Sequence, residues 1–584
     1  MSRNFKRPRK PSEWRRRKGD PPQGGSGAPG QGGSAAQDQG AGATGDQGSA
    51  GAEGSTGAGA GASASGGNAS SHQDNAPAQP EHPLSASLAE NLQAIRQELG
   101  NPMDLKVREL RADNGKLLAA VIHLEGMVND DIVYNQVVKV ITWQLRVIEG
   151  RLPPPDEAFR RLANQLISLT EVRDNPDLKR VILDVIAGDT AVLLDTVPKA
   201  LLCGARGWEG RRVEEPQNEA VVRGPREGFT ETLKTNVSLI RRRVKDPRLR
   251  FDPLQVGKRS KTSVALAYIE DIAPKEIVRE ITDRIKRIET DSVLESGYIE
   301  EFIEDSPWSP FPQMARTERP DSVAASLLEG RVAILVDGSP FALIAPVVFF
   351  QLLMAAEDYY ERWIIGTFVR MLRITMFFLS LFLPSLYVAV TTFHQELLPT
   401  PLVLSIAAQR EGVPFPAFVE ALGMEIAFEM LREAGLRLPR TVGQAVSIVG
   451  ALVIGEAAVS AGLVAPAMVI VVAATGIASF SAPAYNLAIS ARLLRFPVLI
   501  CAATLGLFGV GIAAALILAH LASLRSFGIP YMSPMAPFHG SDLKDIFVRT
   551  PWWGMWSRPR LTGAAQTMRQ EVDAKPTRSN EGRD

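Results

Sequence analysis

Three glutamates in the C-terminal half of the chain are spaced so that their carboxylates share one face of a helix. Glu425, Glu429 and Glu433 recur at intervals of four residues, and an α-helix completes a turn in about 3.6 residues. In an oligomer, a ring of such acids would select cations. The same residues also fit an interfacial amphipathic helix in which Glu429 pairs with Arg432 and Glu433 pairs with Arg437. The spacing leaves both interpretations open.

A fourth glutamate, Glu456, stands inside an apolar stretch, with Ser460 one helical turn later on the same face. A carboxylate at bilayer depth is costly unless it is paired, protonated or facing water. We therefore expect Glu456 to face a protein interior or an aqueous path. Its role is either functional, in an ion path, or structural, as a polar contact between helices.

Arginines gather in one part of the N-terminal half. These are Arg223, Arg226, Arg241, Arg242 and Arg243. Guanidinium groups bind carboxylates and phosphates through two parallel hydrogen bonds. The cluster could hold a phosphate, a lipid headgroup or a partner protein. It could also pair with the acidic stretch 300–305 of the same domain, which is the simpler interpretation.

Motifs of known enzyme classes are missing from the sequence. There is no HExxH, no Walker A sequence and no G-x-S-x-G, and the histidines lack metal-ligand spacing. Two cysteines about 300 positions apart exclude a disulfide framework and a cysteine-based zinc site. With 64 basic and 64 acidic residues, the chain is not a general nucleic-acid binder. We expect no enzymatic activity, no cofactor and no metal.

The elements that would position these residues fall into zones. Residues 1–83 form a basic and then Gly/Ala/Ser/Gln-rich arm, predicted to be disordered because it has almost no apolar side chains to bury. Residues 84–330 alternate helical and strand patterns, which predicts an α/β region with three-layer packing around mixed sheets. A polar, glycine-containing break near 204–217 divides this region into subdomains 84–210 and 211–330.

The residue pattern also predicts individual elements of the α/β region. Helices are expected over 84–99, 130–148, 175–186, 225–240 and 274–288. Strands are expected over 104–111, 116–124, 191–194, 199–202 and 264–268.

Residues 331–540 read as an α-helical polytopic membrane domain, followed by a polar tail over 541–584. Four stretches have the length and apolar character of a membrane span: 374–393, 442–461, 463–483 and 496–518. Two further stretches are ambiguous because charges and prolines interrupt them: 332–354 and 401–432. The domain therefore has four to six membrane segments.

The distribution of arginines tests the topology of these spans. Arg370 and Arg373 precede the first span, which predicts a cytoplasmic α/β region. Five crossings would place all the arginines that flank later spans inside, but would leave the C-terminal tail outside. Four crossings would place the tail inside and leave Arg492 and Arg495 outside. The arginine count favours five crossings, although the rule does not decide.

Residues from about 214 to 537 resemble the A subunit of GerA-family spore germinant receptors. The resemblance covers more than half of the chain and rests on the number, order and spacing of eight stretches. These are EEPQNEAVVRGPREGF (214–229), NVSLIRRRVKDPRL (236–249), FPQMARTERPDSVAASLLEGRVAILVDGSPFALIAP (311–346), EDYYER (357–362), LPSLYVA (383–389), VPFPAFVEALGMEIAFEMLREAGLRLP (413–439), SIVGALVIGEAAVSAGLV (447–464) and SFGIPY (526–531).

The resemblance implies a multi-pass protein of the inner membrane of the endospore, with a cytoplasmic N-terminal region. Such A subunits work with a polytopic, transporter-like B subunit and a lipoprotein C subunit, and are thought to oligomerise and to conduct ions or signal. Together the subunits sense small nutrients and trigger ion release and germination. A SpoVAF-like branch of accessory germination proteins shares these motifs, and the motifs do not separate the two branches.

Overall fold

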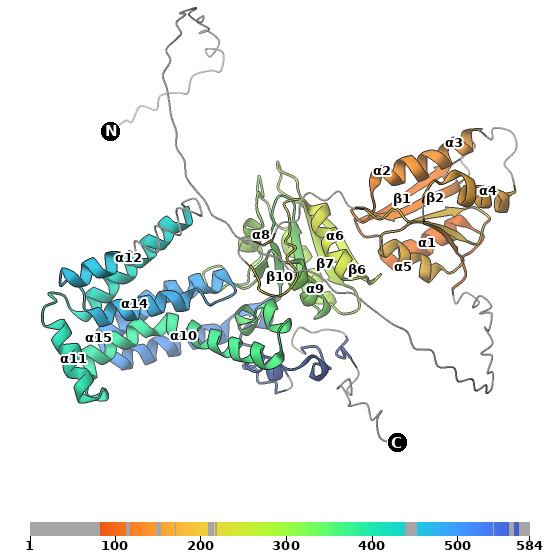
Figure 1. Ribbon diagram of the computed structural model, residues 1–584. Coiled ribbons are helices and arrows are strands. Elements are labelled where there is room, and N and C mark those ends of the chain that lie inside the picture. The colour runs from red at the N-terminus through yellow and green to blue at the C-terminus, as the bar shows by residue number, and fades with distance from the viewer. Residues whose placement is uncertain are drawn as a thin grey trace, which may run out of the picture. The chain divides into compact units, whose positions relative to one another are not determined.

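The computed structural model describes most of the chain after residue 81. The described ranges are 82–111, 117–147, 154–169, 171–207, 215–216, 219–437, 453–540, 542–559 and 566–570. Residues 1–81 of the arm predicted to be disordered, 1–83, lie outside them. Two α/β subdomains come first along the chain, and apolar helices follow them (Figure 1).

The first subdomain is a five-stranded sheet covered by helices on both faces. Its strands are β1 (Leu105–Arg111), β2 (Leu117–Leu124), β3 (Val172–Asn175), β4 (Thr190–Leu194) and β5 (Ala200–Cys203). Its helices are α1 (Leu88–Leu99), α2 (Asp130–Ile132), η2 (Val133–Val138), α3 (Lys139–Val147), α4 (Pro155–Arg161), η3 (Leu162–Leu166) and α5 (Leu178–Ile186).

Alternation along β2 shows how the three layers form. Ala120 and Ile122 pack against α1 and α5, whereas Ala119 and Val121 face the opposite cluster beneath η2, α3 and α4. Successive side chains of a strand point to opposite faces, so an entirely apolar strand needs cover on both sides. Figure 1 shows α1 and α5 below the sheet, and α2 and α3 above it.

The second subdomain has the same construction. Its strands are β6 (Leu249–Val256), β7 (Thr262–Ile269), β8 (Ala315–Thr317), β9 (Val332–Val336) and β10 (Ala342–Ala345). Its helices are α6 (Leu233–Arg243), α7 (Lys275–Lys286), α8 (Ser296–Ile303) and α9 (Pro320–Leu328). One face of the sheet packs on α6 and α9, and the other packs on α7 and α8.

The two subdomains repeat one topology. The strand orders are β1-β2-β4-β5-β3 and β6-β7-β9-β10-β8, so each strand of the second sheet has a counterpart in the first. Helices α1 and α6 precede their sheets, and α5 and α9 stand between corresponding strands. The three-layer prediction is confirmed. The prediction of mixed sheets is wrong, because every strand pair in the described ranges is antiparallel.

Residues 332–354 belong to this second sheet and not to the helical region. They form β9, β10 and the short helix η4 (Phe349–Leu353), and β9 pairs with β7. Every residue of both strands is buried. A strand covered on both faces is as apolar as a membrane segment, which is why the sequence placed the domain boundary too early, at residue 331.

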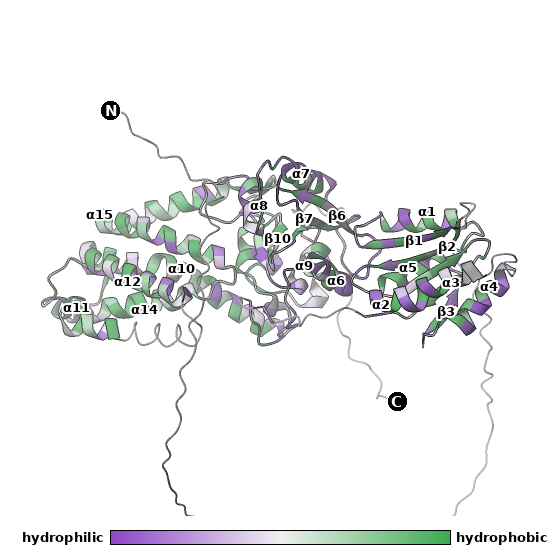
Figure 2. Ribbon diagram, turned by 90° about the horizontal axis from the view of Figure 1, so that it is seen from above, coloured by the Kyte–Doolittle hydropathy of each residue, from purple (hydrophilic) through white to green (hydrophobic). Residues whose placement is uncertain are grey.

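The C-terminal region is built from apolar helices. The bounds are α10 (Trp363–Phe393), α11 (Thr400–Arg410), α12 (Ala417–Arg437), α14 (Pro466–Ser479) and α15 (Tyr485–Ser523), with residues 453–460 also helical. Among the described residues, α10 and α15 are long and apolar enough to cross a membrane, and α14 is a shorter apolar helix. Figure 2 shows their predominantly hydrophobic ribbons. Most of the predicted span 442–461 lies outside the described residues.

Helix α15 is two helical arms that fold back on each other at Gly506. Gly506 has non-helical backbone angles (φ 62°, ψ −140°). Ser490 of the first arm donates a hydrogen bond to Pro310 O, and His520 Nε2 of the second arm lies 2.9 Å from Ser309 Oγ. Thirty residues of straight helix would separate positions 490 and 520 by about 45 Å. The predicted single span 496–518 is therefore wrong, because its middle is a turn.

Short elements connect the larger ones and follow α15. These are η5 (Ala356–Tyr359), η6 (Gln395–Leu397), β11 (Arg525–Ser526), β12 (Ile529–Pro530), η7 (Leu543–Asp545) and η8 (Trp552–Gly554). The stretch after residue 541, expected to be a polar tail, packs against the start of α10. There Asp545 bonds Arg370, and Arg549 N donates to Thr367 Oγ1 at 3.1 Å.

Candidate functional site

The first candidate site is a set of ion pairs between α12 and the first arm of α15, which we call the α12–α15 charge network. Its members are Glu425, Glu429, Arg432, Arg492 and Arg495. Both helices are rich in apolar residues, and a charge enclosed between them needs a partner. The structure brings two of the three predicted glutamates of this stripe, Glu425 and Glu429, into the network.

The Glu425–Arg495 pair is the most enclosed part of the network. Arg495 Nη1 lies 2.5 Å from Glu425 Oε2, and both side chains are almost completely buried. Arg495 Nε also donates to Ser380 O of α10 at 2.7 Å. Arg495 stands ten residues after the start of α15 and eleven before Gly506, about 15 Å from either end of the arm. The pair thus lies halfway along an apolar helix.

Glu429 is shared by two arginines. Arg432 Nη1 lies 3.1 Å from Glu429 Oε1, and Arg492 Nη1 lies 3.3 Å from Glu429 Oε2. The Arg432 guanidinium also stacks on the rings of Phe428 and Phe480. The sequence predicted the Glu429–Arg432 pair from helical spacing alone, and the structure confirms it.

Glu433 stands apart from these buried groups. Its carboxylate pairs with Arg437 on the exposed surface of α12, at 2.5 Å. This pair too was expected from the spacing. The exposure of the glutamate side chains therefore increases along the stripe, from fully buried at Glu425 to exposed at Glu433.

Glu420 is a functional candidate that the sequence analysis missed. Its side chain is buried, accepts from Arg410 Nη2 at 3.1 Å, and accepts from the backbone N–H of Ala465 at 3.0 Å. It thereby fastens the break between α11 and α12 to the start of α14. Its position near the start of a helix, shortly after Pro416, was the available signal.

Glu456 and Ser460 lie on the exposed surface of the helical segment 453–460. Neither takes part in the α12–α15 charge network. That Glu456 faces a protein interior or an aqueous path stays a prediction. The surface that would cover Glu456 has to come from outside the described part of this chain.

The predicted arginine cluster divides between surface and interior. Arg223 and Arg226 are exposed and form long contacts, of 3.8 and 3.9 Å, with acids of the same chain. Arg242 and Arg243 share Glu227. These four arginines pair with acids of the same chain, but not with the stretch 300–305 that the simpler interpretation named as their partner.

Arg241 is completely buried and links the two subdomains. Its guanidinium bonds both carboxylate oxygens of Asp104 at 3.1 Å, donates to Leu249 O, and stacks on Phe251. Asp104 precedes β1 of the first subdomain, and Arg241 is on α6 of the second. Such an enclosed pair leaves Arg241 no surface for an external anion.

A second charged cluster lies at the start of α10, and we call it the α10 clasp. Arg370 and Arg373 both bond Asp358. Arg370 Nη1 also lies 3.1 Å from Asp545 Oδ1, and Tyr359 donates to Asp545 Oδ2 at 2.7 Å. The clasp joins α10, η5 and the C-terminal segment. In the sequence, Arg370 and Arg373 served only to predict on which side of the membrane the α/β region lies.

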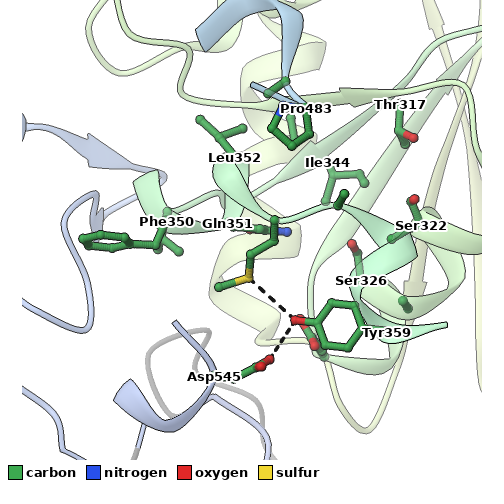
Figure 3. Close-up of a pocket in the computed structure, with 18 of the residues that line it drawn as sticks. Thr317, Ser322, Ser326, Ile344, Phe350, Gln351, Leu352, Tyr359, Pro483 and Asp545 are labelled. Atoms are coloured by element: carbon green, nitrogen blue, oxygen red, sulfur yellow. Dashed lines mark hydrogen bonds between the residues drawn. The ribbon is translucent and has the colours of Figure 1, made fainter. Parts of the chain in front are cut away.

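Beside the α10 clasp lies a cavity of about 690 Å³, between the second subdomain, the α14–α15 loop and the C-terminal segment. Figure 3 shows a polar side formed by β8 and α9 and an apolar side formed by η4 and that loop. Glu219 lines the cavity and accepts from Thr317 Oγ1 at 2.6 Å. Burial raises the pKa of Glu219 to about 7. The cavity thus has a polar side and an apolar side, and it lies between the second α/β subdomain and the helical region.

The fold and the site define a class: a duplicated α/β region followed by apolar helices that carry enclosed ion pairs. The chain belongs to the GerA family, since residues 93–561 match the family model described as "Bacillus/Clostridium GerA spore germination protein". This family is not a known class of enzymes.

The similarity to individual relatives extends over most of this chain and nearly the whole length of each relative. The chain is 46% identical to spore germination protein KA of Bacillus subtilis (strain 168), over 84% of this chain and 90% of that protein. It is 45% identical to the uncharacterized membrane protein YfkQ of the same organism, over 86% and 96%. It is 44% identical to spore germination protein GerLA of Bacillus cereus, over 82% and 96%.

One similar solved structure is the crystal structure of the N-terminal domain of the A subunit of the Bacillus megaterium spore germinant receptor GerK3. It is 33% identical to this chain, with a TM-score of 0.36, and the match covers 46% of this chain and 97% of that domain.

Proposed function

We propose that this chain is the A-type membrane subunit of a spore germinant receptor, in which it couples nutrient sensing to ion release and germination. It would act as an oligomeric ion-conducting or signalling component, together with a B subunit and a lipoprotein C subunit. Its place would be the inner membrane of the endospore, with the α/β subdomains in the cytoplasm. We expect no enzymatic step.

The observation that carries this proposal is the Glu425–Arg495 pair. An enclosed ion pair halfway along an apolar helix adds little stability compared with well-packed apolar side chains. Ionisable residues at bilayer depth mark ion paths and moving contacts in many membrane proteins. The candidate ion-path residues remain Glu425, Glu429, Glu433, Glu456 and Ser460. The exposed Arg223 and Arg226 remain candidates for a partner contact.

The order of contacts along the helices supports six crossings. Glu420, near the start of α12, meets the start of α14, and Arg432, near the end of α12, meets the end of α14, so α12 and α14 are parallel. Arg495 and Arg492 meet Glu425 and Glu429 in turn, so α12 is antiparallel to the first arm of α15. With α10, the segment before α14 and the second arm of α15, the crossings number six. Both ends of this region then lie on one side.

Potassium release from spores lacking this chain, complemented with variants, tests the proposed function. Spores with the wild-type chain should respond to a nutrient panel, and E425Q spores should lose the response to one nutrient class. The matched control is E433Q, which changes an exposed glutamate of the same stripe. The double variant E425L/R495M separates folding from function, because it removes both charges. Normal abundance without ion release would tie the pair to function.

Full release from E425L/R495M spores would contradict a role for the pair in coupling. The second candidate function is that of an accessory germination protein of the SpoVAF-like branch, or of a non-conducting scaffold. The similarity to an uncharacterized membrane protein is compatible with this alternative. Deletion would then slow the response to every nutrient without abolishing any. For Glu456, unchanged ion selectivity in E456Q would exclude a place in the ion path.

A further inference from the structure

The residues that follow α15 include exposed apolar side chains, most of them aromatic, which we call the C-terminal collar. It consists of Phe538, Val548, Trp552, Trp553 and Trp556, and each of these side chains is at least 38% exposed. Three of the eight tryptophans of the chain thus lie within five residues. Contiguous exposed aromatic surface marks contact with a membrane or another protein.

The collar is fixed in place beside the first turns of α10. Trp552 Nε1 donates to Tyr359 O at 3.2 Å, and the two rings lie 5.9 Å apart. Arg549 N bonds Thr367 Oγ1. The collar is therefore continuous with the apolar side chains that α10 exposes there, Ile364 and Phe368.

The level of the collar follows from counting residues along α10. Gly506, at the turn of α15, packs on Phe393 at the end of α10. A hydrocarbon layer of about 30 Å takes about 20 helical residues, which leads from Phe393 back to Arg373. Thr367 then lies about one and a half turns beyond that boundary, at the level of the phospholipid headgroups.

The chemistry of the collar suits that level. Tryptophan prefers the boundary between hydrocarbon and water, where its ring is covered and its N–H can still bond. Basic side chains stand against the same rings: Lys544 on Trp556, and Arg549 and Arg569 on Trp552. Cations at this depth meet lipid phosphates.

We propose that the C-terminal collar lies in the phospholipid headgroup layer, on the side of the membrane that carries the α/β subdomains. The collar would hold the α10 clasp at a fixed depth, because Arg549 and Trp552 are bonded to α10 and η5. This inference rests on the proposed membrane embedding of the helices and goes beyond it, since it assigns a lipid-binding role to a segment that follows the last crossing.

Quenching of tryptophan fluorescence by brominated lipids tests the proposal. The full chain is reconstituted into phosphatidylglycerol–phosphatidylcholine vesicles in which the acyl chains are brominated either near the headgroup or near the chain end. The variant W553F/W556F should lose part of the quenching by headgroup-proximal bromine. The control W143F removes an exposed tryptophan on α3 of the first subdomain. Because that tryptophan is not expected to contact lipid, W143F should raise the fraction of the tryptophan fluorescence that brominated lipids quench.

A second variant separates this inference from the proposed function. In I500W, a new tryptophan replaces an exposed residue of the first arm of α15, and bromine near the chain end should quench it. No quenching of that tryptophan would overturn the membrane embedding itself. Quenching of I500W together with an unchanged quenched fraction in W553F/W556F would overturn the collar alone, and would assign that surface to solvent or to another protein.

Discussion

At the scale of single residues, the α12–α15 charge network divides into local and distant partners. Spacing along one helix predicted the Glu429–Arg432 and Glu433–Arg437 pairs, because residues three or four apart share a face. It could not predict Arg495, which is 70 positions from Glu425 and meets it only after the helices pack. The sequence therefore predicted the ion pairs of Glu429 and Glu433, and it missed Arg495 as the partner of the buried Glu425.

Removing one partner of the Glu425–Arg495 pair should be severely destabilising. R495M leaves Glu425 enclosed without its cation, which costs about 3–5 kcal/mol. E425L/R495M should recover most of that loss. Thermal unfolding of the full chain in detergent measures both. The exposed pair supplies the control, since R437A should change stability by only about 0.5 kcal/mol. Equal losses in R495M and R437A would show that burial does not set the cost.

At the scale of elements, the apolar strands and the turn of α15 were the hard cases. Strands β9 and β10 are buried on both faces, so their composition does not distinguish a covered sheet from a membrane segment. The stretch around Gly506 has no charge and no proline to mark a break. Helices α1 and α7 were easier, because their apolar residues recur at helical spacing on one face.

The turn of α15 should depend on glycine at position 506. Its backbone angles belong to a region that other residues hardly occupy, and an added Cβ would lie 2.7 Å from the His394 ring and 2.9 Å from Phe393. We expect G506A to lower the melting temperature of the full chain in detergent, with a cost of about 1–3 kcal/mol from the backbone alone.

Gly511 offers a matched control in the second arm. A Cβ added at Gly511 would meet no atom within 4 Å, and the backbone is helical on both sides. G511A should be neutral or slightly stabilising, since alanine favours helix over glycine by up to about 1 kcal/mol. If G506A behaved like G511A, the reversal of the chain at this turn would be wrong.

At the scale of the whole molecule, the repeated α/β topology was invisible in the sequence, because the corresponding strands share order and pairing but not side chains. The fold-back at Gly506 was equally hidden. Counting arginines favoured five crossings and placed the tail outside. In the six-crossing arrangement proposed above, the fold-back supplies a further crossing, and it returns the tail to Arg370 at the start of α10.

Cysteine accessibility in sealed vesicles checks the six-crossing arrangement. In a C501S background, K258C in the second subdomain and T567C in the C-terminal segment should react from the same side. G412C, in the break between α11 and α12, should react from the opposite side. Labelling of T567C together with G412C would instead establish an odd number of crossings.

The fold-back at Gly506 also limits how information can reach this protein. In the six-crossing arrangement, the side opposite the α/β subdomains consists of the short helix α11 and tight turns near residues 394–399, 411–416, 461–465 and 506. Within the described ranges, that side offers little surface on which a dissolved nutrient could be recognised. A chemical signal from beyond the membrane must then be received by a neighbouring protein and passed on sideways, through contacts made within the bilayer.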